Sequence, residues 1–136
     1  MTHPNDWMVR VYWEDTDAGG IVYYANYLKF FERARTEWLR AKGIHQQALR
    51  QESDGIFVVH EAHVRYLHSA RLDDMLKIRT TILKQGRASM RLQQQCLLPA
   101  AEGSQLLCEA TIRVGWISAT TQKPLRIPKE LLDALI

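Results

Sequence analysis

The sequence has little cysteine, and its cysteines are not arranged to bind a metal. Cys96 and Cys108 are the only two among 136 residues, and neither belongs to a Cys-X-X-Cys pair or a histidine-rich cluster. Zinc sites and disulfide-stapled secreted folds need more thiols than this. We therefore expect two buried structural thiols and no metal site.

Long apolar runs and runs of one charge sign are also missing. No apolar run approaches the roughly 20 residues of a membrane-spanning helix, and MTHPNDWMVR lacks the apolar core of a signal peptide. The formal net charge is only +3, with Lys and Arg dispersed and no nucleic-acid-binding motif. These absences favour a cytoplasmic protein that binds no nucleic acid and has no integral membrane segment. A small anionic ligand or an acidic partner would suit the charge.

The composition is that of an ordinary globular chain. Hydrophobic residues make up 46% and charged residues 24%, which is enough for one core. We expect a single domain over residues 1–136, with residues 1–7 as a flexible tail.

The periodicity of apolar residues predicts an α+β fold. Met8–Trp13 alternates like a strand, and 23–42 has helical spacing with one apolar face. That face comprises Tyr27, Phe30, Phe31, Ala34, Trp38 and Ala41. A second short helix is expected over 45–52.

The rest of the chain reads as strands joined by turns. Alternating runs cover 56–67, 76–82, 88–96 and 106–116, a turn is expected at 71–74, a loop at 99–103, a short strand between Pro124 and Pro128, and a helical turn at KELLDALI. In the first run, Ile56, Val58, His60, Ala62, Val64 and Tyr66 should share a face. We predict an antiparallel sheet of about five or six strands wrapped around one long central helix. Its outer face and exposed edges would need cover, which favours a dimer or larger oligomer.

The stretch WEDTDAGGIVYYANYLKFFERAR carries more polar and glycine residues than a helix start needs. Asp17 before Gly19 and Gly20 fits a turn or helix cap, a metal ligand or a catalytic carboxylate. A calcium loop requires more oxygen ligands than Asp15 and Asp17 supply. Asp15 is expected to orient the loop or to pair with a cation such as Arg10.

Three segments resemble a known family: VRVYWEDTDAGGIVYYANYLKFFERARTEWL, VRYLHSARLDDMLKIRTTI and WISATTQKPLRIPKELL. With this layout the chain resembles the hot-dog-fold acyl-CoA thioesterases of the 4-hydroxybenzoyl-CoA thioesterase family, and within it the YbgC-type branch associated with the Tol–Pal system. The resemblance covers nearly the whole chain from about Met8.

That resemblance implies hydrolysis of acyl-CoA to a free acid and CoA, without a cofactor. It implies Asp17 as the catalytic carboxylate and the backbone amide of Tyr24 as the main donor to the thioester carbonyl. It also implies a cytoplasmic homodimer or homotetramer with active sites at the subunit interface. An acyl carrier protein is a second candidate partner, and peripheral contact with the inner membrane is a further expectation.

Further site residues follow from the same comparison. Gly19 and Gly20 would bring the backbone close to the acyl carbonyl, where helix amides and their dipole stabilise an oxyanion. Val22 is a further candidate substrate-binding residue. Tyr24 departs from the histidine of many relatives. Asn26 is expected to orient the loop or a water molecule.

The remaining contacts lie on the strands. His63 is a candidate substrate contact. Arg87 and Ser89 of the GRAS segment are candidates for the CoA phosphates, with Lys84 as the next choice.

Several alternatives stay open at this point. Asp17 is either the nucleophile, forming a mixed anhydride, or a general base on water. A non-hydrolytic acyl-CoA or acyl-carrier-protein binder is another class of function. A hot-dog dehydratase or hydratase would use a histidine with its carboxylate, and the Asp17 loop contains none.

Overall fold

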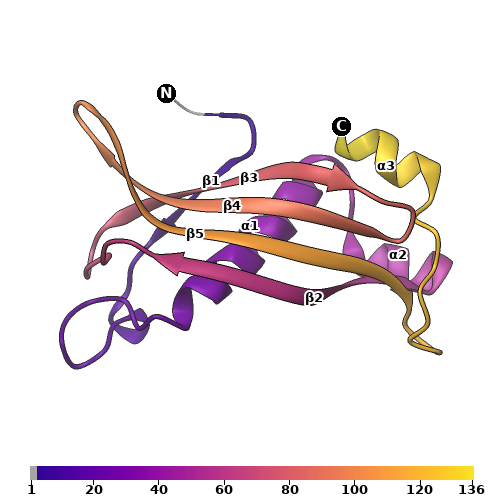
Figure 1. Cartoon of the computed structure of the whole chain (residues 1–136), viewed down its shortest axis with the longest axis horizontal. Coiled ribbons are helices and arrows are strands. Elements are labelled where there is room, and N and C mark those ends of the chain that lie inside the picture. Colours follow the sequence, from indigo (N-terminus) through magenta and orange to yellow (C-terminus); the bar gives the residue numbers. More distant parts are fainter. Residues whose placement is uncertain (1–2) are drawn as a thin grey trace.

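The computed structural model describes residues 3–136, and Met1 and Thr2 lie outside the described residues. The elements in chain order are β1 (Asp6–Arg10), the 3₁₀ helix η1 (Trp13–Asp15), α1 (Asn26–Ala41), α2 (Gln46–Ser53), β2 (Gly55–Tyr66), β3 (Met75–Gln85), β4 (Ser89–Ala100), β5 (Gly103–Ser118) and α3 (Lys129–Leu135). The antiparallel sheet has the strand order β1-β3-β4-β5-β2. Figure 1 shows α1 lying along one face of this curved sheet, with α2 and α3 near one end. The predicted α+β architecture is confirmed, with five strands.

The buried face of α1 forms the centre of the core. Its buried residues are Tyr27, Phe30, Phe31, Ala34, Trp38 and Leu39. The spacing predicted this set except at its end, where Ala41 is exposed and Leu39 is buried instead. Opposite the helix lie the inward side chains of the central strands. Cys96 and Cys108, directly paired on β4 and β5, are free thiols and fully buried, as expected.

The core also contains one polar group that the apolar pattern does not reveal. Gln94 on β4 is fully buried, and its amide donates to the Phe31 carbonyl (2.9 Å) and to Thr80 Oγ1 (3.1 Å). Its carbonyl oxygen accepts a hydrogen bond from Arg35 (2.8 Å). Both the nitrogen and the oxygen of the Gln94 side-chain amide therefore have hydrogen-bond partners, as a buried polar group requires. The network ties α1 to β3 and β4.

Strand β2 contains a bulge that overturns the predicted division of its side chains. Val59 pairs with Val114, but Glu61 pairs with Arg113, so His60 is an extra residue. Val59 and Ala62 therefore share the α1 side of the sheet, whereas Val58 lies on the other side. Since strict alternation holds only for an unbroken strand, the prediction that Val58 and Ala62 share a face is wrong.

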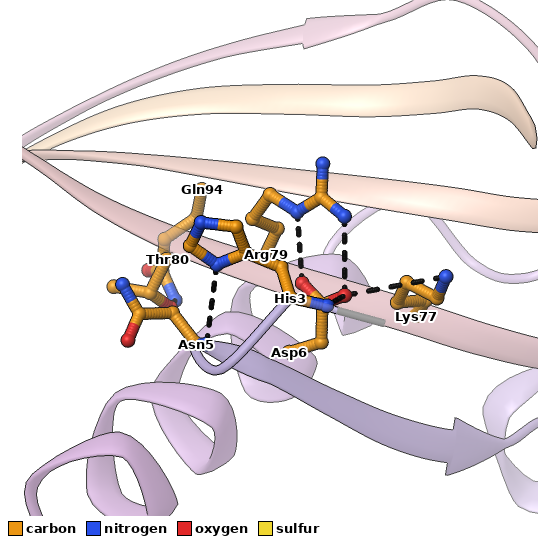
Figure 2. Close-up of polar contacts among 7 residues, drawn as sticks. All are labelled: His3, Asn5, Asp6, Lys77, Arg79, Thr80 and Gln94. Carbon is orange, nitrogen blue, oxygen red and sulfur yellow. Dashed lines mark hydrogen bonds and ion pairs between the residues drawn. The ribbon is translucent and has the colours of Figure 1, made fainter. Parts of the chain in front are cut away.

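The N-terminal strand begins earlier and ends earlier than predicted. β1 includes Asp6 and Trp7 of the predicted flexible tail, and the chain then bends into η1, so the strand ends at Arg10 and not at Trp13. Asp6 fixes this segment: its carboxylate accepts two hydrogen bonds from Arg79 (2.8 and 3.1 Å) and lies 4.0 Å from Lys77 Nζ (Figure 2). A side chain this well paired holds the start of β1 to β3.

The C-terminal segment differs in one respect. The strand expected between Pro124 and Pro128 is absent, and only a single bridge joins Ile117 to Pro124. The Leu125 N–H donates to the Trp116 carbonyl (2.9 Å), but the Ile127 N–H donates to the Arg87 carbonyl (2.7 Å) instead of to β5, so no ladder continues along that strand. The predicted final helix is present as α3.

The outer face of the sheet, away from α1, is polar. Register places Arg79, Gln93, Gln95, Glu109, Thr111 and Arg113 on it. Such a face can lie against water, so its composition does not support the expectation that it needs cover. The β2 edge differs: the strand has 12 residues and pairs on one side only.

We predict that Asp6 makes the fold sensitive to acid. Burial raises the pKa of this carboxyl, but the hydrogen bonds from Arg79 and the His3 N–H, with the charges of Arg79 and Lys77, outweigh burial and lower it. A lowered carboxyl pKa stabilises the fold above the ordinary value of 3.8, and that stability is lost as the pH falls through the folded value. Asp6→Asn should lower the free energy of unfolding at pH 7 by about 1–3 kcal/mol and flatten its decline in acid, measured by urea unfolding.

Glu37→Gln is the matched control. The Glu37–Arg40 pair lies on the surface, with side chains 38% and 55% exposed, and should contribute little. Equal effects of the two substitutions would contradict the role given to Asp6.

Candidate active site

The segment between β1 and α1 is folded around Asp15. The Asp15 carboxylate accepts a hydrogen bond from the Tyr12 N–H (2.8 Å), and the residue is 8% exposed. Its backbone carbonyl accepts from the Tyr23 N–H (3.0 Å) and from the Asn26 side-chain amide (2.9 Å). Asp15 therefore orients the loop. Asn26, the first residue of α1, fastens that loop to the helix. Arg10 does not pair with Asp15; it donates to the Asp73 carbonyl.

Asp17 lies in a tight turn closed by its own neighbours. The Asp17 N–H donates to the Ile21 carbonyl (2.9 Å), and the Gly20 N–H donates to the Asp17 carbonyl (3.0 Å). One carboxylate oxygen, Oδ1, accepts from the Gly19 N–H (2.8 Å). No other group among residues 3–136 donates to this carboxylate, and Asp17 is exposed. One oxygen is thus fixed while the other remains available.

Glycine is required at positions 19 and 20 for two different structural reasons. A Cβ on Gly19 would lie 3.2 Å from Asp17 Oδ1, so a larger residue would crowd the carboxylate. Gly20 has φ +78°, a backbone conformation that L side chains rarely adopt. Gly19 permits the contact with Asp17, and Gly20 permits the turn that returns the chain to α1.

The start of α1 has no side-chain cap. Ala25 is the N-cap residue and makes no capping hydrogen bond. Within the described chain, the N–H groups of Tyr24 and Ala25 have no hydrogen-bond acceptor. Uncapped amides at a helix N-terminus, reinforced by the helix dipole, favour a negatively charged oxygen.

Tyrosine rings surround this helix start. Tyr24 packs at 5.0 Å from Tyr23 and edge-on against Tyr66 at 5.8 Å, between ring centroids. Tyr66 also meets the buried Tyr27 at 5.8 Å. Tyr24 is 61% exposed, so its ring forms an open aromatic wall next to the free amides.

The remaining predicted residues do not all gather here. Val22 is 3% exposed and packs into the core, and its N–H donates to the Ala70 carbonyl (2.9 Å). His63 pairs with Thr111 on the outer face, where it lines a hollow of about 240 Å³ with Glu61 and Arg91. It thus lies across the sheet from α1.

Arg87 and Ser89 lie at the far end of the sheet. β3 starts at Met75, which pairs with Arg10 just before the Asp17 loop, and runs to Gln85 before the turn that holds Arg87. Eleven residues of strand span roughly 33 Å at about 3.3 Å per step. One chain therefore does not bring Arg87 or Ser89 close to its own Asp17.

The structure contains two hollows that the sequence does not predict. One of about 170 Å³ is lined by Lys84, Gly86, Ser89, Met90, Arg91 and Arg113. Lys84, Arg91 and Arg113 lie directly opposite one another on β3, β4 and β5. The strand register creates this cation row, and only a correct register would have revealed it in the sequence.

The other hollow, also of about 170 Å³, lies between α1 and β2. Its apolar wall includes Phe57, Val59 and Leu92, and its polar wall includes Glu32 and Arg35. It contains no residue of the Asp17 loop.

The residues that the structure describes contain no group of three or more His, Cys, Asp or Glu able to hold a metal ion. Among those same residues, no helix has the length and apolar character needed to cross a membrane.

Comparison with known proteins identifies the family of this chain. A sequence profile of the thioesterase-like superfamily matches residues 11–135. The acyl-CoA thioesterase YbgC of Haemophilus influenzae is 42% identical over 126 residues, 93% of this chain and 90% of that protein. The acyl-CoA thioester hydrolase YbgC of Escherichia coli O6:H1 is 46% identical over 126 residues, covering 93% and 91%.

A solved structure leads to the same group. The probable thioesterase from Bartonella henselae is 34% identical, with a TM-score of 0.82 over 90% of this chain and 98% of that one. The predicted hot-dog fold is thereby confirmed. Matched along nearly its whole length in both sequence and fold, the chain belongs to the thioesterase-like superfamily.

Proposed function

We propose that this chain hydrolyses acyl-CoA thioesters to a free acid and CoA, with Asp17 acting at a carbonyl held by the amide of Tyr24. The observation that carries the assignment is the uncapped start of α1, preceded in the same loop by a carboxylate fixed by Gly19. The YbgC relatives bear the name of acyl-CoA thioesterase or thioester hydrolase, which favours hydrolysis over the binding-module and dehydratase alternatives. The chain is an acyl-CoA thioesterase.

The chemistry requires a carboxylate and an oxyanion donor. As the thioester carbonyl becomes tetrahedral, its oxygen gains negative charge, which the N–H groups of Tyr24 and Ala25 stabilise without reorganising. The free oxygen of Asp17 either attacks the carbonyl carbon, expelling the CoA thiolate and leaving a mixed anhydride for water, or takes the proton of an attacking water. The Gly19 N–H keeps the carboxylate oriented in both routes.

The site is completed by a second copy of the chain. The unpaired edge of β2 offers backbone groups that pair with another β2, and Val59 on it is 49% exposed. The Tyr66 end of β2 lies next to Tyr24, whereas its Val58 lies in register with Gly115 and Ser89. Antiparallel pairing of two β2 strands about a two-fold axis brings the Tyr66 end of one copy to the Gly55 end of the other. Asp17 of one copy then approaches the α1–β2 hollow, Arg87 and Ser89 of its partner.

The cation row is the proposed contact for CoA phosphates. Arg91 and Arg113 lie opposite each other, an arrangement that destabilises a sheet unless the charge is neutralised, and Glu61, opposite Arg113 on β2, sets one carboxylate against the three cations of the row. None of Lys84, Arg91 and Arg113 has a carboxylate within salt-bridge distance in the described residues. Ser89 lines the same hollow, which supports Arg91 and Arg113 as proposed phosphate contacts together with Arg87 and Ser89. Arginine guanidinium groups suit phosphate oxygens by geometry as well as charge.

The first prediction concerns Asp17. Asp17→Asn keeps the size of the side chain but removes the basic and nucleophilic oxygen. Thiol release from a panel of short, long and aromatic acyl-CoAs should fall by about 100-fold or more. Asp133→Asn, at an exposed position on α3, is the control and should keep full activity. Equal rates in the two variants would remove Asp17 from the mechanism.

The second prediction concerns assembly. Val59→Glu places a charge on the exposed edge strand and should convert a dimer of 15.8 kDa chains into inactive monomers, seen by sedimentation. Leu83→Glu is the control, since Leu83 is 50% exposed on β3, away from that edge. A wild-type chain that is monomeric and fully active would contradict the shared site.

The third prediction concerns the phosphates. Arg91→Gln and Arg113→Gln should each raise KM for acyl-CoA about tenfold with little change in kcat, whereas Arg33→Gln on α1 should not. Hydrolysis of an acyl-N-acetylcysteamine, which has no phosphates, should be unaffected by all three changes. A loss with that truncated substrate would show that the arginines act elsewhere.

A further inference from the structure

One buried residue links the two halves of the candidate site. Ala70 is fully buried in the irregular segment between β2 and β3. Its N–H donates to the hydroxyl oxygen of Tyr27 (3.0 Å), and its carbonyl accepts from the Val22 N–H (2.9 Å). Tyr27 lies on α1, one turn after Tyr24, and Val22 ends the Asp17 turn. Ala70 is thus bonded to both the helix and the turn.

The segment around Ala70 is itself anchored. The N–H groups of Leu67 and His68 donate to the Leu107 carbonyl on β5 (2.8 and 3.0 Å). A bridge also joins Arg71 to Ile21, the residue whose carbonyl closes the Asp17 turn. Hydrogen bonds thus connect α1 to Ala70 through Tyr27, and Ala70 to the Asp17 turn through Val22.

We propose that the Tyr27 hydroxyl is a positioning residue for hydrolysis: through Ala70 it fixes where the Asp17 turn lies relative to the free amides at the start of α1. This inference rests on the proposed function. Tyr27 is 3% exposed, so it acts through other residues rather than on substrate. Burial raises the pKa of Tyr27 to about 12, so its hydroxyl stays neutral at ordinary assay pH. Misplacement of a reacting group by about 1 Å is enough to cost roughly 100-fold in rate.

The test is Tyr27→Phe. The ring that packs against Phe30 and Tyr66 is kept, and only the acceptor of the Ala70 N–H is lost. We expect kcat to fall about tenfold or more, KM to stay within about threefold, and the pKa values of the pH–rate profile to stay unchanged.

Thr80→Val is the matched control. It removes another buried hydroxyl that accepts a single N–H bond, from Gln94, in the middle of β3. It should lower the melting temperature comparably while kcat stays unchanged. Equal kcat in the two variants, or a shifted pH profile in Tyr27→Phe, would overturn the positioning role.

Amide hydrogen exchange supplies a readout that does not depend on turnover. In Tyr27→Phe, the Ala70 and Val22 amides should exchange at least tenfold faster than in wild type, and they should not do so in Thr80→Val. Unchanged exchange would overturn the proposal. If the wild-type chain itself releases no thiol, the proposed function fails, and the exchange data still decide whether Tyr27 braces the turn.

Discussion

The geometry of the site depends on how the Asp15 carbonyl joins the loop to the helix. That one oxygen receives the Tyr23 N–H and the Asn26 amide, so the chain enters α1 at a fixed angle. Asn26 is used for this bond and cannot also cap the helix from within its first turn. The amides of Tyr24 and Ala25 are left open as a result. A missing cap costs a helix about 1 kcal/mol, and here the vacant donors are the ones proposed to hold the thioester carbonyl.

The same constraint explains why the motif is crowded. Asp15 is required for the fold of the loop, Asp17 for the open carboxylate, Gly19 for close approach to that carboxylate, and Gly20 for its positive φ. None of these roles can be transferred to a neighbour without changing the turn. The tyrosines that follow then wall the helix start with rings rather than with charged groups that would compete for the amides.

Much of this was predictable from the sequence because it rests on local patterns. Helical spacing identified α1 and its buried face, and the Asp-Ala-Gly-Gly run identified the turn. The predicted start of β1 was wrong because a tertiary contact determines it. Asp6 joins the sheet through Arg79, which is 73 residues away. The predicted faces of β2 were wrong for a related reason. The extra residue at His60 moves every later side chain to the other face, and the spacing of apolar residues does not reveal it.

Residues that depend on strand register were the least predictable. The cation row of Lys84, Arg91 and Arg113 exists only because β3, β4 and β5 pair as they do. The hydrogen bond between the Ala70 N–H and the Tyr27 hydroxyl joins residues 43 positions apart. The sequence does not reveal it, because a tyrosine on the apolar face of a helix predicts simple core packing. Composition and spacing identify the elements, but long-range pairing determines which side chains meet.

The most direct test of the account is a crystal structure of the Asp17→Asn variant with an unhydrolysed acyl-CoA bound. We predict the thioester carbonyl oxygen at about 2.7–3.1 Å from the Tyr24 nitrogen, with the substituted side chain beside the carbonyl carbon and the phosphates at Arg91 and Arg113 of a second copy. A thioester bound with its carbonyl away from the start of α1 would contradict the central claim that these amides and Asp17 form one site.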